Sequence, residues 1–107
     1  MTESEFLELA EATLTAIEAA AEATGADLDA TRSGNVLTLE LADGAKIVVN
    51  SQAPMRQIWV AARSGGFHFE RRGDRWCDTR DGTELFATLS TLVSAQGGEA
   101  VLLRKPA

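Results

Sequence analysis

The stretch NSQAPMRQIWVAARSG, residues 50–65, holds a turn followed by a segment with the two-residue period of a β-strand. The apolar residues at alternate positions are Ile58, Val60 and Ala62. Side chains two positions apart lie on the same face of a β-strand, so these three are predicted to face a core. Trp59 then lies on the opposite face with the polar residues Gln57 and Arg63. Two further polar residues lie just upstream, Asn50 and Gln52. The stretch therefore predicts a strand with one buried face and one polar face, and it places a tryptophan on the polar face.

The same two-residue period recurs on both sides of this strand, in VLTLEL (36–41), KIVVN (46–50) and GFHFE (66–70). Each segment has one apolar face, and His68 and Glu70 point away from it in the last one. The connections are short and carry turn residues: Ser33-Gly34-Asn35, Asp43-Gly44, Ser64-Gly65-Gly66 and Gly73-Asp74. Short turns join neighbouring strands as hairpins, so the sheet is predicted to be mostly antiparallel.

Two segments have the period of an amphipathic helix. Residues 4–23 are rich in helix formers, with Ser4 as the expected N-cap and Gly25 as the stop signal. Their predicted core face consists of Phe6, Leu9, Ala10, Thr13, Ile17 and Ala20. The second helix is ELFATLSTLVSAQ (84–96), followed by Gly97-Gly98. Its predicted core face consists of Leu85, Phe86, Leu89, Leu92 and Val93.

The chain order is thus a helix, about six strands and a second helix. Because each strand has one apolar face, both helices are expected to pack on that face. The predicted fold is an α+β, two-layer sandwich in which residues 1–107 form a single domain. RWCD (75–78) is a further short strand in which Trp76 or Cys77 could point inward, and AVLL (100–103) either adds a last strand or covers the core.

Length and composition limit the class of protein. A chain of 107 residues has room for one core. The single Cys77 excludes an internal disulfide and a cysteine-built metal centre, which favours a reducing compartment. Neither a signal peptide nor a membrane span is expected, because no stretch has the required run of apolar residues. These features predict a soluble cytoplasmic protein.

The negative charge is concentrated at the beginning of the chain. Residues 1–31 contain eight acidic residues and no lysine or arginine, whereas the remaining residues contain eight acidic and ten basic ones. The segment charges of −8 and +2 argue against nucleic-acid binding and favour a cationic partner. On the helical wheel Glu11, Glu18 and Glu22 lie together, with Glu8 beside them and no local counter-charge. This ridge is either a solvated helix face or a site of weak cation capture, and its carboxylates suit hard cations bound shallowly.

The exposed Trp59 also allows two interpretations. Either other parts of the chain cover it or stack on it, or it is an anchor for a partner. His68 is the only histidine, so neither a zinc triad nor a Ser-His-Asp arrangement can form. His68 is interpreted as a surface or interface residue, and Cys77 as a small core residue. The sequence offers no catalytic centre, and the protein is not expected to be an enzyme.

The pattern Asn50-x-Gln52-x-Pro54-x-x-Gln57-x-Trp59, the acidic first helix and the order helix, antiparallel strands, helix resemble the frataxin family. The resemblance is to its bacterial, CyaY-like branch and covers nearly the whole chain. SEFLELAE, ADGAKIVVN, QIWVAARSGGFHFE, GDRWCD and DGTELF are similar to that family's blocks in order and spacing.

This resemblance implies an iron-binding regulator of iron–sulfur cluster assembly that docks on cysteine desulfurase and its scaffold protein, without membrane or nucleic-acid partners, and acts as a monomer. The expected iron-binding residues are Glu3, Glu8, Glu11, Glu18, Glu22, Asp27 and Asp29. The expected partner-binding residues are Asn50, Gln52, Gln57, Trp59, Arg63 and His68. Alanines at positions 19, 20, 21 and 23 make the acidic ridge thinner than is usual in bacterial relatives. The alternatives are a ferroxidase or iron-storage protein and an acidic adaptor that does not sense metal.

Overall fold

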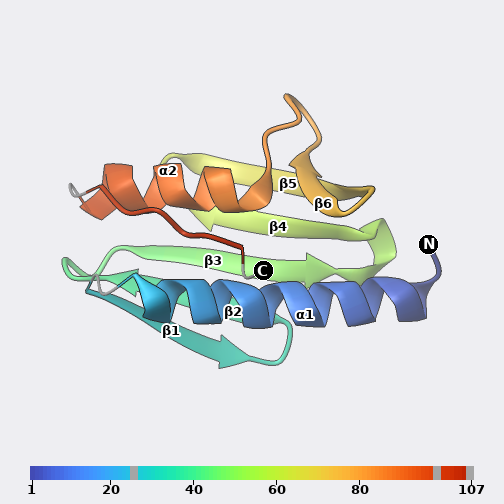
Figure 1. Cartoon of the computed structure of the whole chain (residues 1–107), viewed down its shortest axis with the longest axis horizontal. Helices are drawn as coiled ribbons and strands as arrows, with labels where there is room; N and C mark the ends of the chain where they lie inside the picture. Colours follow the sequence, from blue (N-terminus) through green and yellow to red (C-terminus); the bar gives the residue numbers. More distant parts are fainter. Residues whose placement is uncertain (25–26, 98–99, 106–107) are drawn as a thin grey trace.

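The computed structural model describes residues 1–24, 27–97 and 100–105 (Figure 1). Along the chain the elements are α1 (Glu3–Ala23), β1 (Leu28–Ser33), β2 (Val36–Leu41), β3 (Lys46–Gln52), the 3-10 helix η1 (Ala53–Met55), β4 (Gln57–Ala62), β5 (Gly65–Arg72), β6 (Arg75–Asp78) and α2 (Leu85–Gly97). Both helices lie on the same face of the sheet (Figure 1). The predicted two-layer α+β sandwich is confirmed.

The sheet is a six-stranded meander in the order β1-β2-β3-β4-β5-β6, and every neighbouring pair is antiparallel. The predicted sequential hairpins are therefore confirmed. Gly34 and Gly73 adopt φ values of 58° and 63° in two of the turns, a region that glycine enters without steric cost. The turn between β3 and β4 is made differently, with η1 followed by Arg56 in the left-handed conformation at φ 53°.

The N-cap of helix α1 lies two residues earlier than expected. Thr2, not Ser4, caps the helix: its hydroxyl accepts a hydrogen bond from the Glu5 backbone N–H, and the Glu5 carboxylate accepts one from the Thr2 N–H. This capping box needs an acidic residue three positions after the cap, which Thr2 has and Ser4 lacks. The expected stop at Gly25 lies outside the described residues.

The buried face of α1 largely matches the prediction. Its buried residues are Phe6, Ala10, Thr13, Leu14, Ile17, Ala20 and Ala21. Leu14 was not predicted, although it is almost fully buried, and Leu9 is only half-buried. The buried face of α1 therefore includes Leu14 and is shifted away from Leu9, relative to the face predicted from the helical period.

Helix α2 begins at Leu85 and is capped by Glu84, whose carboxylate accepts hydrogen bonds from the backbone N–H groups of Phe86 and Ala87 at 2.8 and 3.2 Å. All five predicted core residues are buried. The helix includes Gly97, and Gly98 lies outside the part of the chain that is described.

The segment after α2 covers the core instead of adding a strand. In Figure 1 it runs between the two helices. Leu103 is buried, and its backbone N–H donates to the Ser90 hydroxyl at 2.8 Å. Val101 is held in the same way by the Ser94 hydroxyl at 2.9 Å. The second of the two predicted alternatives is thus the correct one.

Trp76 and Cys77 in β6 are both buried, on opposite faces of the strand. Trp76 faces α1: its ring packs edge-on against Phe6 with centroids 5.9 Å apart, and its indole N–H donates to the Thr13 hydroxyl at 2.8 Å. Cys77 forms an isolated antiparallel bridge with Glu84 along the edge of β6 that faces away from β5. The contacts of Trp76 with Phe6 and Thr13 tie α1 to β6, the last strand of the sheet.

Of the helices described, none combines the length and the apolar character needed to cross a membrane.

Candidate functional site: an acidic helix edge and an open sheet face

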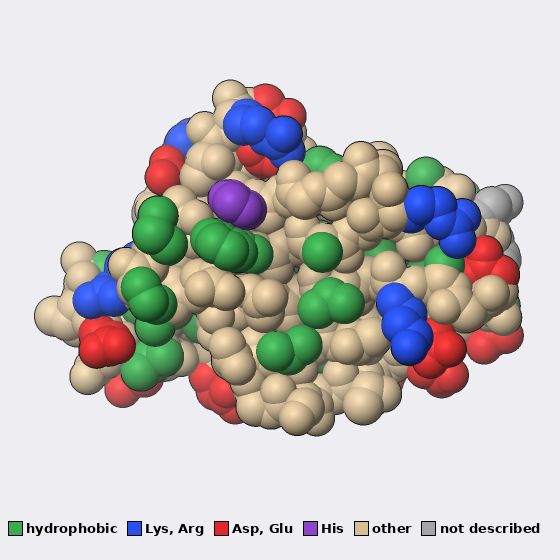
Figure 2. Space-filling model, turned by 180° about the vertical axis from the view of Figure 1, so that it is seen from behind, with side chains coloured by type: hydrophobic (Ala, Val, Ile, Leu, Met, Phe, Trp, Pro, Cys, Tyr) green, Lys and Arg blue, Asp and Glu red, His purple; other side chains and the backbone are tan. Residues whose placement is uncertain are grey.

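The sheet face opposite the helices carries a row of side chains at its centre. Asn50, Trp59 and His68 lie directly opposite one another on β3, β4 and β5. No helix in the described part of the chain covers this face, and Figure 2 shows the histidine beside a group of apolar side chains on it. The predicted outward orientation of Trp59 is confirmed.

Trp59 is half-buried because it stacks on its cross-strand neighbour. The rings of Trp59 and His68 are nearly parallel, with an interplanar angle of 8° and centroids 4.2 Å apart. The Trp59 indole N–H donates to Oε1 of Gln57 at 2.8 Å. Stacking was one of the two interpretations of this residue, and it packs one face of the indole against the imidazole of His68.

Amide side chains extend this row toward η1. Gln52 lies opposite Gln57 in the ladder, and the Gln52 amide donates to Oδ1 of Asn50 at 3.3 Å. Met55 in η1 is 57% exposed, and sequence analysis did not include it in this surface. The four predicted residues Asn50, Gln52, Gln57 and Trp59 are therefore brought together with His68. We call these five the amide–tryptophan surface.

Arg63 does not belong to the amide–tryptophan surface. It lies in the turn after β4, six residues beyond Gln57, which is about 20 Å along an extended strand. Its guanidinium is 3.9 Å from the Asp43 carboxylate, and its backbone N–H donates to Gln96 Oε1 at 3.1 Å. Because β4 ends at Ala62, Arg63 lies beyond the strand that carries Trp59, and its predicted part in partner binding stays a prediction.

On β5, the same sheet face carries an ion pair that sequence analysis did not identify. Arg72 donates two hydrogen bonds to Oε1 of Glu70, at 2.9 and 2.7 Å. These hydrogen bonds, and the attraction of the Glu70 charge, raise the pKa of the Arg72 guanidinium. Glu70 lies opposite Gln57, so this pair borders the amide–tryptophan surface on the β6 side.

The carboxylates of α1 form a stripe at helical spacing, Glu8, Glu11, Glu18 and Glu22, which we call the acidic stripe. The sequence predicted no counter-charge for it, and this is wrong. Arg32 from β1 forms ion pairs with Glu11 and, at 3.4 Å, with Glu18, and donates to the Thr15 hydroxyl at 3.0 Å. Arg32 has the same strand parity as the core residue Leu28, so its side chain points toward α1.

Arg32 therefore neutralises the middle of the acidic stripe and leaves its two ends. Within the described chain, neither Glu8 nor Glu22 takes part in an ion pair, and both are exposed. The arginine side chain is only 16% exposed, against 68% for Glu11. The carboxylates of the acidic stripe without an ion pair in the described chain are thus those at its two ends.

The remaining three predicted iron ligands lie apart from one another. Glu3 is the first residue of α1, and Asp27 is exposed just before β1. Asp29 lies opposite Glu40 on the open sheet face, because Leu28 and Ala30 on either side of it pack toward the helices. Among the residues that the structure describes, no group of three or more histidine, cysteine or acidic side chains could enclose a metal ion. The arrangement suits shallow, exchangeable binding by one or two carboxylates.

Comparisons with known proteins agree with this architecture. Residues 1–99 match the family model of the Frataxin-like domain. The chain is 63% identical to the iron-sulfur cluster assembly protein CyaY of Herminiimonas arsenicoxydans and 60% identical to that of Janthinobacterium sp., with 97% of both chains covered in each case. Among solved structures, it is similar to frataxin from Psychromonas ingrahamii, with a TM-score of 0.91 at 35% identity, 98% of this chain and 100% of that one. It is also similar to trimeric yeast frataxin complexed with ferrous iron, with a TM-score of 0.67 at 29% identity, 92% of this chain and 88% of the yeast chain.

Proposed function

Because this chain belongs to the frataxin family, we propose that it is an iron–sulfur cluster assembly protein that binds iron weakly on α1 and docks on a cysteine desulfurase and its scaffold protein. The pathway follows from the names of its relatives, and a yeast structure of the same fold holds ferrous iron. In this proposal the protein regulates the desulfurase and catalyses no reaction itself. It acts as a monomer, which light scattering of the free protein checks.

The observation that carries the docking proposal is the Trp59–His68 stack on an uncovered sheet face. The stack holds the indole in place, so a partner gains its contact area without the entropy cost of ordering a mobile side chain. Tryptophan is also among the residues that contribute most to interface affinity. We assign the short-range part of docking to the amide–tryptophan surface.

We assign the long-range part to the ends of the acidic stripe. Exposed charges steer association and act over roughly 10 Å at 0.1 M salt. Glu8 and Glu22 lack ion pairs in the described chain, so their field is available to a basic partner or to iron. Iron bound there lowers the negative charge of α1 and so changes the attraction to the partner, which links docking to iron.

The docking experiment measures the Kd for cysteine desulfurase at about 0.05 M and about 0.5 M salt. Trp59→Ala is expected to raise Kd roughly thirtyfold at both salt concentrations. The double variant Glu8→Lys/Glu22→Lys is expected to raise Kd mainly at low salt, because added salt screens exposed charges. Leu102→Ala is the matched control, since Leu102 is an exposed apolar residue outside both surfaces.

Equal affinities for Trp59→Ala and the unchanged protein contradict the docking proposal. The iron link is tested separately by desulfurase turnover with the protein present, with and without Fe²⁺. A turnover that does not respond to iron would show an adaptor that does not sense metal. Fe²⁺ oxidation that is faster with the protein than without it, and slower after Glu8→Gln/Glu22→Gln, would instead show a ferroxidase.

A further inference from the structure

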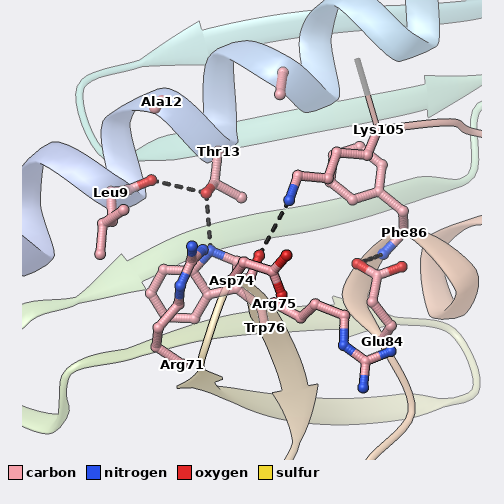
Figure 3. Close-up of a pocket in the computed structure, with 11 residues that line it drawn as sticks. Leu9, Ala12, Thr13, Arg71, Asp74, Arg75, Trp76, Glu84, Phe86 and Lys105 are labelled. Atoms are coloured by element: carbon pink, nitrogen blue, oxygen red, sulfur yellow. Dashed lines mark hydrogen bonds between the residues drawn. The ribbon is translucent and has the colours of Figure 1, made fainter. Parts of the chain in front are cut away.

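A large cavity lies on the helix side of the molecule, away from the amide–tryptophan surface. It has a volume of about 540 Å³ and is bounded by α1, the β5–β6 hairpin, the start of α2 and the C-terminal segment (Figure 3). Pockets of roughly 300–1,000 Å³ are those that hold small organic ligands. This space is thus of the right size for such a ligand and is separate from the proposed docking surface.

The walls of the cavity are apolar and fixed in place. Leu9, Ala12 and Ala16 contribute from α1, and Trp76 and Phe86 from the sheet and α2. The hydrogen bond from Trp76 to the Thr13 hydroxyl, drawn in Figure 3, holds the indole against α1. Two alanines on the helix leave the space that larger residues would fill. The cavity is therefore preformed.

The rim of the cavity is cationic, in a chain whose net charge is −6. It carries Arg71, Arg75 and Lys105, and none of the three forms an ion pair with the carboxylates of the described chain. Four other arginines do form such pairs: Arg32, Arg63, Arg72 and Arg80. Half of the six cations without an ion pair are thus gathered at one cavity.

The rim cations are also oriented. The Arg71 guanidinium carbon lies 5.5 Å from the centroid of the Trp76 ring, and its Nε donates to the Gly73 carbonyl at 2.9 Å. Lys105 Nζ donates to the backbone carbonyl of Asp74 at 3.1 Å, which spans the mouth from the C-terminal segment to the hairpin. The hydrogen-bond acceptors of both cations are thus neutral backbone carbonyls.

Two carboxylates belong to the same lining, Asp74 and Glu84. Glu84 is engaged by the backbone N–H groups at the start of α2. Three cations and two carboxylates leave a local charge of about +1, which favours a monoanion over a phosphate dianion.

We propose that this cavity binds a small, flat, apolar molecule that carries one carboxylate. The apolar body occupies the space between α1 and Trp76, and the carboxylate lies at the rim, where guanidinium groups bind carboxylates through paired hydrogen bonds.

The proposal is tested with 2-naphthoate as the probe and ¹⁵N–¹H NMR of the full chain as the readout. Backbone signals of Ala12, Ala16, Arg71 and Arg75 are expected to shift and to saturate with a Kd of about 1 mM or tighter, the range for an efficiently bound ligand of this size. Arg75→Gln is expected to raise Kd at least about fivefold. Arg104→Gln is the matched control, because Arg104 is an exposed arginine next to Lys105 that does not line the cavity.

The neutral amide 2-naphthamide separates charge from size. It is expected to bind at least about fivefold more weakly than 2-naphthoate. Ala12→Leu fills part of the cavity from the exposed side of α1, so it is expected to weaken the binding of 2-naphthoate. A thermal melt of this variant checks that the fold is kept. Equal binding of acid and amide, equal effects of Arg75→Gln and Arg104→Gln, or shifts confined to the amide–tryptophan surface would each overturn the proposal.

Discussion

The rings of Trp59 and His68 stack across β4 and β5 with centroids 4.2 Å apart, in the middle of the sheet face that no described helix covers. The stack joins these two neighbouring strands by side chains as well as by backbone hydrogen bonds. Because the stack holds both rings in place, this part of the surface is ordered before any partner binds.

Replacing His68 by Ala should cost about 0.5–1 kcal/mol of unfolding free energy, because a stacked aromatic pair contributes about that much beyond the area it buries. Urea unfolding followed by far-ultraviolet circular dichroism measures the loss. His68→Phe keeps a ring over Trp59 and serves as the control. A His68→Ala variant as stable as the unchanged protein, or a His68→Phe variant as unstable as His68→Ala, would show that the stack contributes nothing.

The strands could be predicted well because their signals are local. In VLTLEL, KIVVN and QIWVAA large aliphatic residues recur at every second position, and this period includes the core residues Leu37, Ile47 and Ile58. Glycine in the turns then fixes which strands are neighbours. The two-layer arrangement follows because every strand has a single apolar face to cover.

The features that sequence analysis missed depend on contacts between distant residues. Arg32 pairs with Glu18 and Glu11, which are 14 and 21 positions away, and the distance between them in space depends on how α1 crosses β1. The sequence nevertheless contained one clue. Arg32 lies at the same alternate positions as Leu28 and Ala30, so its side chain shares the strand face that packs against the helix. The orientation of Trp76 could not be decided from the sequence, because Trp76 and Cys77 are both apolar and both become buried.

The hydrogen bond between Trp76 and Thr13 should matter for stability, because Trp76 is only 3% exposed. Thr13→Val removes the acceptor and leaves a buried indole N–H without a partner, which should cost about 1–3 kcal/mol. In a Trp76→Phe background, where there is no N–H to satisfy, the same change should cost at least about 1 kcal/mol less. Urea unfolding of the four proteins gives this coupling. Identical costs in both backgrounds would show that the hydrogen bond has no net effect.

The capping box at the start of α1 predicts a dependence on pH. Hydrogen bonds from the Thr2 backbone and hydroxyl lower the pKa of Glu5 from its usual 4.5. A carboxyl with a lowered folded-state pKa stabilises the fold above its unfolded pKa, and this contribution is lost as pH falls through the folded value. Glu5→Gln should therefore be less stable than the unchanged protein at pH 6, and the difference should shrink as pH falls below about 4.5. Glu3→Gln removes a charge from the same turn without touching the box, and a matching pH profile for it would contradict this explanation.

A second acid-sensitive contact, between Asp81 and Thr83, lies in the turn before α2. The Asp81 carboxylate accepts a hydrogen bond from the Thr83 backbone N–H at 3.0 Å, which lowers the pKa of Asp81 from 3.8. The stability that this contact provides is present above pH 3.8 and is lost as the carboxyl protonates below it. Because asparagine does not titrate, the stability of Asp81→Asn should fall less than that of the unchanged protein between about pH 4 and pH 2.5. Thermal melts across that range measure it, and a profile that still falls as steeply as that of the unchanged protein would assign the acid sensitivity elsewhere.

Arg32 sets how much of the acidic stripe is available to a cation. Arg32→Gln releases Glu11 and Glu18, so the stripe should bind Co²⁺ about three- to tenfold more tightly, as expected when one positive charge is removed a few ångströms from the ligands. The unfolding free energy should fall by less than about 1 kcal/mol, since the ion pairs are partly exposed. Backbone NMR titration of the α1 signals measures the affinity. Arg72→Gln is the matched control, because it removes the same charge from an ion pair on β5, away from α1. If both variants bind Co²⁺ equally tightly, net charge alone controls the affinity, and Arg32 has no local effect on the stripe.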